Sequence, residues 1–243
     1  KFRWKGKLYC FQAAAMGLGP IPRVFTKLTK PILAHLHDLG HKITSFIDDS
    51  LLVGDSESEV MQGVIDTVNT FDSLGFTIHD EKSQFVPTQE ITYLGFVINS
   101  KDMSVTLTDE RKKKLVDACD ALLRYSKVKI RAVASCIGLM VSSLAAVPLG
   151  QLHYRSLERS KNRALKLSHG NWDKVMTLTE EEKTDPSWWV QNLHSQKGQV
   201  RVMPATHCLI TDASGSTGWG AVFNSPNKVE TSTQGLWSVE DKC

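Results

Sequence analysis

The feature that most constrains the fold is a pair of adjacent acids, Asp48-Asp49, between two apolar, strand-like stretches. The flanking apolar residues are Ile43, Phe46 and Ile47 before the pair and Leu51, Leu52 and Val53 after it. Consecutive side chains on a regular strand point to opposite faces, so two neighbouring carboxylates converge only where the chain turns. We therefore predict a β-hairpin over residues 42–54, with the acids at its tip and buried strands on both sides.

Two carboxylates at a tight turn are suited to holding divalent metal ions. Mg²⁺ prefers hard oxygen ligands, and two ions about 3.5–4 Å apart stabilise the attacking and leaving oxygens in phosphoryl transfer. The pair, helped by a third carboxylate from elsewhere, would provide such ligands. Asp is also common in ordinary polar β-turns, so this segment alone leaves both interpretations open.

The segments around this hairpin alternate between strand and helix patterns. Residues 2–12 alternate apolar and polar around a Lys-Gly-Lys turn and predict another hairpin. A helix is expected from near Pro22 to Leu39, with Gly40 ending it and Pro31 as a possible kink. Ser56 and Glu59 form a capping-box pattern before a helix that ends at Gly75. Short strands are expected over residues 76–78, 83–86 and 91–98.

From Thr108 to about Lys166 the apolar periodicity is helical, without strand signals, which predicts a separate all-α unit of three helices. Residues 111–166 carry thirteen Lys and Arg against three Asp and Glu, a net of +10, whereas the whole chain carries +3. A basic stretch in an otherwise acidic chain indicates a surface that faces a polyanion. A solvated helical face has the same composition.

Beyond this stretch, Thr179 and three following Glu residues predict a short helix that carries Trp188, Trp189 and Leu193. Strands are expected to return at 208–211, 220–223 and 228–231. The fold class predicted from the whole pattern is α+β.

Size and cysteine usage exclude several classes of protein. The chain has 243 residues, of which 41% are hydrophobic and 23% charged, as in an ordinary globular protein. We expect no membrane contact, and five scattered cysteines without a C-x-x-C pair favour an intracellular protein of the cytoplasm or nucleus. The first residue is Lys1 rather than Met, so we expect a piece of a longer chain.

Four motifs in order resemble those of reverse transcriptases. Phe46-Ile47-Asp48-Asp49 resembles the [YF]-x-D-D box, and AAMGLGPIPRVFTK at 14–27 resembles the preceding F-G-L-x-x-A-P-x-x-F-x-K box. Leu74-Gly75-Phe76 with Lys82 resembles the next palm motif, and Tyr93-Leu94-Gly95-Phe96 resembles the primer-grip strand. Four weak motifs with the expected order and spacing are much more specific than any one of them.

The resemblance extends along the rest of the chain. AVPLGQLHYRSLERSK at 146–161 is similar to the thumb–connection segment of retrotransposon polymerases, especially the DIRS-type group. Ile210 to Ser214, Gly218 to Ala221 and GLWS at 235–238 are similar to the first three strands of the attached RNase H domain. The resemblance implies the C-terminal part of a palm at 1–100 (an antiparallel sheet with helices on one face), a helical thumb or connection at 101–170, a linker or connection at 171–205 and the start of an RNase H-like domain at 206–243.

The resemblance also implies roles for particular residues. Asp48 and Asp49 would be catalytic and bind Mg²⁺ or Mn²⁺, and Gly17 would let backbone approach the nascent base pair. Pro22 and Phe25 would fix the helix beneath the template. Leu94, Gly95 and Phe96 would hold the primer end.

Other implied roles concern charges. Lys82 would stabilise the leaving pyrophosphate, although an exposed surface lysine is the alternative. Asp212 would be the first metal-binding carboxylate of RNase H, and a strand-end Asp near a Gly-rich turn is its alternative. The basic residues expected to contact template–primer phosphates without reading sequence are Arg155, Arg159, Lys161, Arg163 and Lys166.

Some features depart from the family or lie outside it. Met16 replaces the usual Phe and Ile21 the frequent Ala, which should preserve apolar packing with altered shape. The first palm motif, the fingers and the remaining RNase H carboxylates are missing, and Glu240 is not assigned to that role. We therefore predict that the 243-residue chain alone has neither polymerase nor RNase H turnover.

Two more residue groups are expected to be structural. His35, His37 and His41 lack acidic or Cys partners at ligand spacing, which favours core or surface histidines over a zinc site. Trp188-Trp189 favours packing over stacking on bases.

The leading hypothesis is part of an RNA-directed DNA polymerase fused to RNase H, from a retrotransposon. Its expected partners are an RNA template, a DNA primer, RNA–DNA hybrid and deoxynucleoside triphosphates, and the sequence leaves the oligomeric state open. A non-catalytic nucleic-acid-binding remnant of a decayed or co-opted retroelement is the second hypothesis. An unrelated α+β protein with a chance acidic turn is the third.

Overall fold

The structure is a computed structural model that describes residues 1–15, 17–200, 207–225 and 228–238. Met16, Glu240 and Cys243 lie outside these residues. The chain forms two compact units, Lys1–Val200 and Arg201–Cys243, which are described separately below. In the described ranges we find no helix that combines the length and the apolar character needed to cross a bilayer.

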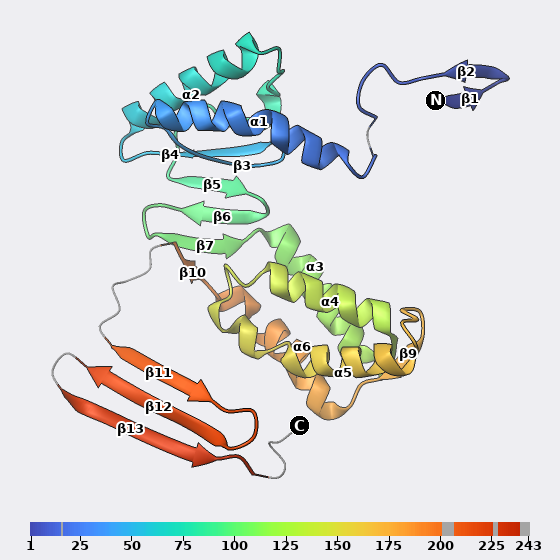
Figure 1. Cartoon of the computed structure of the whole chain (residues 1–243), viewed down its shortest axis with the longest axis vertical. Helices are drawn as coiled ribbons and strands as arrows, with labels where there is room; N and C mark the ends of the chain where they lie inside the picture. The colour runs from blue at the N-terminus through green and yellow to red at the C-terminus, as the bar shows by residue number, and fades with distance from the viewer. Residues whose placement is uncertain (16, 201–206, 226–227, 239–243) are drawn as a thin grey trace. The chain divides into compact units, whose positions relative to one another are not determined.

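The first unit begins with a short hairpin and a helix–hairpin–helix arrangement (Figure 1). Its elements are β1 (Phe2–Trp4), β2 (Lys7–Tyr9), α1 (Ile21–Asp38), β3 (Lys42–Phe46), β4 (Asp49–Val53) and α2 (Glu57–Ser73). Helix α1 continues through Pro31. Ile32 and Leu36 of α1 are buried against Ile43 of β3, and this small core anchors the β3–β4 hairpin.

A four-stranded antiparallel sheet follows in the order β10-β7-β6-β5. Its strands are β5 (Glu90–Tyr93), β6 (Phe96–Asn99), β7 (Ser104–Leu107) and β10 (Gly198–Gln199). A short 3-10 helix, η1 (Asp80–Lys82), precedes it. Segments 76–78 and 83–86 form no strand, so those two predictions were wrong; Phe76 and Phe85 are half-buried apolar residues in irregular backbone. Phe76 packs against the core around α1, which explains its apolar character without a strand.

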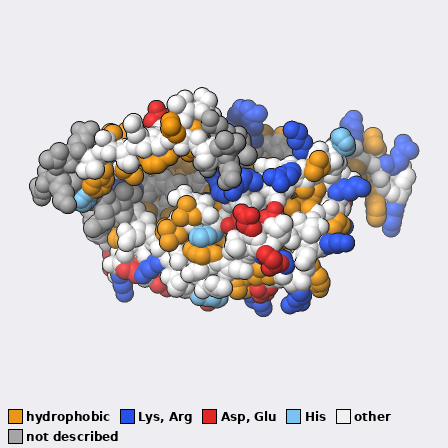
Figure 2. Space-filling model, turned by 90° about the horizontal axis from the view of Figure 1, so that it is seen from below, with side chains coloured by type: hydrophobic (Ala, Val, Ile, Leu, Met, Phe, Trp, Pro, Cys, Tyr) orange, Lys and Arg blue, Asp and Glu red, His pale blue; other side chains and the backbone are white. Residues whose placement is uncertain are grey.

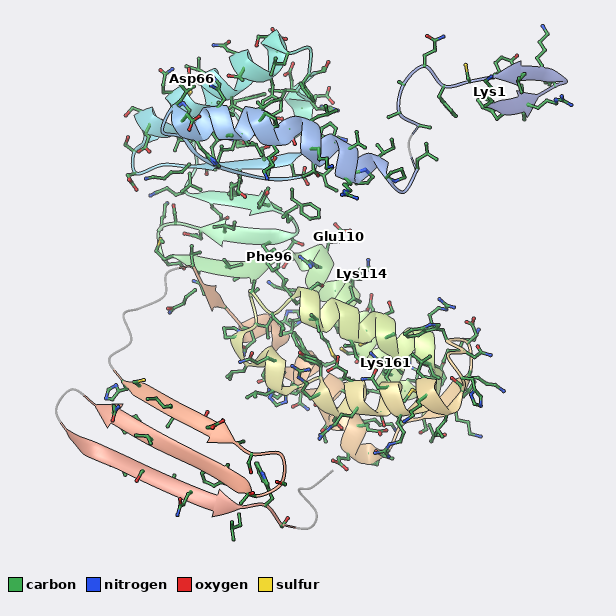
Figure 3. All side chains as sticks on the ribbon, in the orientation of Figure 1. Lys1, Asp66, Phe96, Glu110, Lys114 and Lys161 are labelled. Atoms are coloured by element: carbon green, nitrogen blue, oxygen red, sulfur yellow. The ribbon has the colours of Figure 1, made fainter. Side chains whose placement is uncertain are left out.

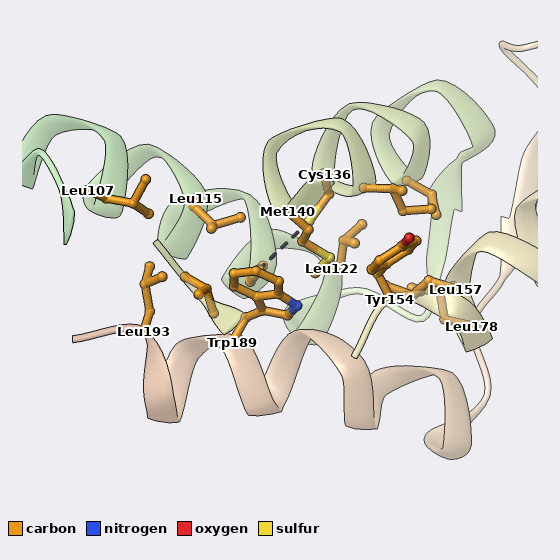
Figure 4. Close-up of a cluster of buried hydrophobic side chains, with 14 of the residues drawn as sticks. Leu107, Leu115, Leu122, Cys136, Met140, Tyr154, Leu157, Leu178, Trp189 and Leu193 are labelled. Carbon is orange, nitrogen blue, oxygen red and sulfur yellow. Dashed lines mark hydrogen bonds between the residues drawn. The ribbon is translucent and has the colours of Figure 1, made fainter. Parts of the chain in front are cut away.

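The helical part of the first unit contains four helices around one large core. Its elements are α3 (Asp109–Arg124), β8 (Lys127–Lys129), α4 (Ile130–Ser142), η2 (Pro148–Leu152), α5 (Arg155–Leu167), β9 (Val175–Thr177), α6 (Glu180–Asn192) and η3 (Leu193–Ser195). Trp189 is fully buried among leucines and Met140 (Figure 4), which confirms its predicted packing role. The expectation of no strand here was wrong, because β8 pairs with β9 almost fifty residues later.

The second unit is a three-stranded antiparallel sheet in the order β11-β12-β13. The strands are β11 (Cys208–Ala213), β12 (Gly218–Ser225) and β13 (Lys228–Leu236). Ser214 shapes the first turn, because its hydroxyl accepts hydrogen bonds from the amides of Thr217 and Gly218. The architecture is thus mixed α and β with antiparallel sheets, as predicted.

Candidate active site

The two acids lie at the tip of the β3–β4 hairpin. Phe46 pairs with Asp49, so Ile47 and Asp48 are the two turn residues and Asp49 is the first residue of β4. Ile47 has a φ of 57°, a left-handed conformation that β-branched residues rarely adopt. Both acids are exposed to solvent. The strained turn therefore presents two adjacent acidic residues at one end of a hairpin.

The strands beside the acids are less buried than their sequence suggests. Ile43 is 5% exposed, as expected, but Phe46 and Val53 are 58% and 56% exposed. The prediction of buried strands on both sides was therefore wrong in part. The cause is that β3 and β4 form a two-stranded sheet within the described residues. Helix α1 packs on one face of this sheet and buries only the side chains on that face.

Three hydroxyl groups hold the tip. The Ser45 and Ser50 hydroxyl oxygens lie 2.6 Å apart across the hairpin, and Ser45 also donates to the Asp49 carbonyl at 3.3 Å. The Tyr93 hydroxyl donates to the same carbonyl at 3.3 Å from the end of β5. Burial raises the pKa of Tyr93, and the charge of Asp49 raises it further, so the phenol stays protonated and able to donate.

Leu94 and Gly95 form the tight turn between β5 and β6, beside Tyr93. Their φ values are 49° and 77°, the two positive angles of a type I′ turn. The expected single strand over 91–98 is therefore a hairpin, with Phe96 as the first residue of β6. The hydrogen bond from Tyr93 connects the turn predicted to hold the primer to the acidic tip.

The acidic tip fits part of a magnesium site. Asp48 and Asp49 provide the hard oxygen atoms that Mg²⁺ prefers. Across the described parts of the chain, no three His, Cys, Asp or Glu side chains are clustered closely enough to hold a metal ion. Two carboxylates leave most of an octahedral shell to water, substrate phosphates or further protein ligands.

The residues of the glycine-rich box lie at the start of α1. Gly17 has a φ of 86°, and a Cβ there would meet nothing within 4 Å, so its backbone angle is what requires glycine. Pro22 occupies the first turn of α1. Phe25 is half-buried and packs edge-on against Phe76 at 6.2 Å between ring centres. Among the described contacts, none joins these residues to Asp48.

Lys82 ends the short 3-10 helix η1 and is exposed. No interaction found within the described residues joins it to the acidic tip.

Four basic residues form one stripe along α5. Arg155, Arg159 and Arg163 are spaced by four residues and Lys166 by three more, so they share a helix face, and all are exposed. Lys161 lies on α5 (Figure 3), but it is half-buried on the side of Leu157 and Leu165. Figure 2 shows Lys and Arg side chains interspersed with acidic and hydrophobic ones on the face that it draws.

Asp212 lies near the end of β11, opposite Gly220 of β12. It is exposed, and its carboxylate accepts a hydrogen bond from the Ala213 amide at 2.9 Å. It lines a pocket of about 560 Å³ together with Trp219 and Gln234 of the neighbouring strands. The side chain is thus accessible from the solvent, as a metal ligand requires.

Sequence reasoning missed Arg111, whose guanidinium donates to the Leu94 carbonyl at 2.9 Å. One signal was present in the sequence: Arg111 lies in the first turn of α3, where acidic side chains suit the helix dipole better. Two of the three histidines make structural contacts, and one of their partners is an acid that sequence reasoning did not find. His37 bonds the Ile43 carbonyl at 2.7 Å, and His41 bonds Asp66 at 2.8 Å.

The comparison with protein families matches the part of the chain that carries the acidic tip. Residues 1–98 match the family described as reverse transcriptase (RNA-dependent DNA polymerase). The matched segment contains α1, the β3–β4 hairpin with Asp48 and Asp49, and the β5–β6 turn. No curated protein has significant similarity to the chain.

Three solved structures with the same fold are foamy viral proteins. The protease–reverse transcriptase in complex with double-stranded DNA has a TM-score of 0.63 and 17% identity, over 99% of this chain and 47% of that one. The same protein in complex with an RNA/DNA hybrid gives 0.62 and 18%, over 99% and 30%. A third, the "dRH" form with double-stranded DNA, gives 0.56 and 17%, over 90% and 35%. The chain therefore shares the fold but spans less than half the length of these relatives.

Proposed function

We propose that this chain is part of an RNA-directed DNA polymerase of a retrotransposon, fused to RNase H. The observation that carries the proposal is the exposed Asp48-Asp49 turn within the segment that matches the reverse transcriptase family. The resemblance of residues 146–161 supports a DIRS-type element. The proposed domains are the palm part at 1–100, the helical thumb or connection at 101–170, the linker or connection at 171–205 and the start of an RNase H-like domain at 206–243. An intracellular location, in the cytoplasm or nucleus, is part of the same proposal.

Asp48 and Asp49 would hold Mg²⁺ or Mn²⁺ at the primer end. The ions would supply charge stabilisation for the attacking 3′-oxygen and the leaving pyrophosphate. The Leu94-Gly95 turn, connected to the tip through Tyr93, would orient the primer strand. Further oxygen ligands would come from the incoming deoxynucleoside triphosphate and from a third carboxylate, which no cluster among the described residues provides.

The nucleic acid would be a primer on an RNA or DNA template. The α5 stripe would contact phosphates and give affinity without sequence reading. Complexes of the foamy viral proteins with double-stranded DNA and with RNA/DNA hybrid support this ligand class. Asp212, in its accessible pocket, would be one metal-binding carboxylate of the RNase H-like domain.

A nucleic-acid-binding remnant without catalysis is the second candidate. It is favoured by the absence of a three-ligand cluster among the described residues, since the α5 stripe could bind phosphates without any metal. The two candidates share binding to hybrid and differ in nucleotide transfer.

The test is Mg²⁺-dependent primer extension on an RNA template by the uninterrupted reading frame that contains this chain. We expect extension by the wild-type protein and a loss of at least about a thousandfold in Asp48→Asn, as for removal of a group that stabilises the transition state. Asp72→Asn, an exposed acid at the end of α2, is the matched control and should keep full activity. Salt-dependent binding of hybrid without extension by the wild type would establish the remnant instead.

A further inference from the structure

The β5–β6 turn has a conformation that its sequence does not favour. Type I′ turns need positive φ at both central residues and prefer Asn-Gly, whereas Leu94 occupies the first position here with a φ of 49°. A leucine has no side-chain hydrogen bond to offer its own backbone in this region. The turn therefore needs support from outside the hairpin.

Arg111 provides that support from the first turn of α3. Its Nη1 donates to the Leu94 carbonyl at 2.9 Å, and its guanidinium carbon lies 4.6 Å from the centre of the Phe96 ring. Figure 3 shows Phe96 in the sheet beside the start of α3, which Glu110 marks. A Cβ at Gly95 would approach the Arg111 Cδ to 3.0 Å. Gly95 is thus required by its φ and by the close passage of Arg111.

The same side chain also reaches a second helix. Arg111 Nη2 donates to the Ser142 carbonyl at 3.0 Å, at the last residue of α4. Cations are favoured there, because helix C-terminal carbonyls lack intrahelical partners and carry partial negative charge. The planar guanidinium donates hydrogen bonds to two carbonyls from separate elements at once. A lysine ammonium is a compact point charge and cannot reproduce this geometry.

We propose that Arg111 is a positioning residue that fixes the Leu94-Gly95 turn against α3 and α4 and so places the primer end over the acidic tip. The connection runs from Ser142 through Arg111 to Leu94, and from the adjacent Tyr93 to Asp49. The primer role rests on the proposed function. The support of the turn by Arg111 does not, and it can be measured without nucleic acid.

The first arm of the test is amide hydrogen exchange of the free chain, resolved for the segment 93–96. In Arg111→Ala and Arg111→Lys we expect exchange about tenfold faster or more, because a charge-assisted bond to the turn is lost or weakened. Lys114→Ala removes one exposed charge from the same helix and should leave exchange unchanged. Unchanged exchange around Met140 in α4 shows that each variant is folded.

The second arm places 2-aminopurine at the 3′ end of a DNA primer on an RNA template. At saturating protein, the wild type and Lys114→Ala should change the fluorescence equally, whereas both Arg111 variants should lose most of the change. Arg111→Lys retains the positive charge. A lost fluorescence change in this variant therefore shows that Arg111 acts through positioning and not through electrostatic affinity.

Exchange at 93–96 that stays at the wild-type rate in Arg111→Ala overturns the inference. Faster exchange with a full fluorescence change overturns the primer role. Failure of the proposed function is recognised separately, because the uninterrupted reading frame then extends no primer although the exchange difference at 93–96 remains. A wild-type chain that binds no hybrid removes the primer role but leaves the support of the turn by Arg111 intact.

Discussion

At the scale of single residues, the candidate site depends on backbone angles that its side chains do not prefer. Ile47 and Leu94 both have positive φ, which costs an L-residue about 1–2 kcal/mol each. The two strained residues lie in the turn that presents Asp48 and in the turn that Arg111 supports. Strained backbone persists only where the surrounding structure holds it, and it is concentrated at functional sites.

Asp48 and Asp49 should matter for activity and hardly for stability. Both are exposed, so Asp48→Asn and Asp49→Asn should change the free energy of unfolding by less than about 0.5 kcal/mol. Urea unfolding of the two variants, followed by circular dichroism, checks this. A destabilisation above about 2 kcal/mol would indicate that the acids are structural instead.

Asp185 predicts a pH dependence of stability. It is 5% exposed and accepts a hydrogen bond from the Leu157 amide at 3.2 Å. Burial raises its pKa, and the amide bonds to Leu157 and Ser156 oppose this only in part. A folded pKa above the unfolded one means that the stabilising contribution is full below about pH 4 and is lost as the pH rises through the folded pKa.

The comparison that isolates this effect is wild type against Asp185→Asn, which keeps an oxygen acceptor but does not titrate. The free energy of unfolding of the wild type, relative to that of the variant, should be higher near pH 4 than near pH 7. A difference that stays constant between these pH values, or grows with pH, would contradict the raised pKa.

At the scale of elements, the sequence predicted secondary structure correctly where the whole pattern lies within a few neighbouring residues. The hairpin over 42–54 and the helix after Thr179 were predicted correctly; Thr179 and Glu182 form a reciprocal capping box. At Ser56 only half of the expected box is present, because the Glu59 carboxylate accepts from Asp55. Strand β8 was missed because its partner is distant in sequence, and propensity cannot report such pairing.

The α5 stripe gives a prediction for binding. Arg159→Ala with Arg163→Ala should weaken binding to RNA–DNA hybrid and reduce the slope of log K against log salt by about 1 per lost phosphate contact. Lys161→Ala is the control from the half-buried side of the same helix and should leave that slope unchanged. Fluorescence anisotropy over a salt series measures both. If the double arginine variant and Lys161→Ala change the slope equally, the α5 stripe is not the contact surface.

At the scale of the whole molecule, the fold class followed from the change of periodicity, but the completeness of the site did not. The order of motifs at Gly17, Asp48 and Leu94 predicted the matched segment. The contacts of Arg111 could not be predicted, because its partners lie 17 and 31 residues away in sequence. The chain spans less than half of its structural relatives, and the described residues hold two acids at the tip.

We therefore expect the 243-residue chain alone to show no primer extension and no RNase H turnover. The reason is that, among the described residues, no cluster of three metal-binding side chains forms at either proposed metal site. Extension assays with Mg²⁺ and with Mn²⁺ check this. Robust extension that Asp48→Asn abolishes would show that the two acids suffice.

The central claim is that the Asp48-Asp49 turn holds a divalent ion at the primer end. The most direct measurement replaces Mg²⁺ by Fe²⁺ in the chain bound to a primer on an RNA template, and maps the hydroxyl-radical cuts on the primer strand. We expect cuts within a few nucleotides of the primer 3′ end that disappear in Asp48→Asn and Asp49→Asn but remain in Asp72→Asn. Cuts that persist in both tip variants, or a wild-type complex with no cuts near the 3′ end, would contradict the claim.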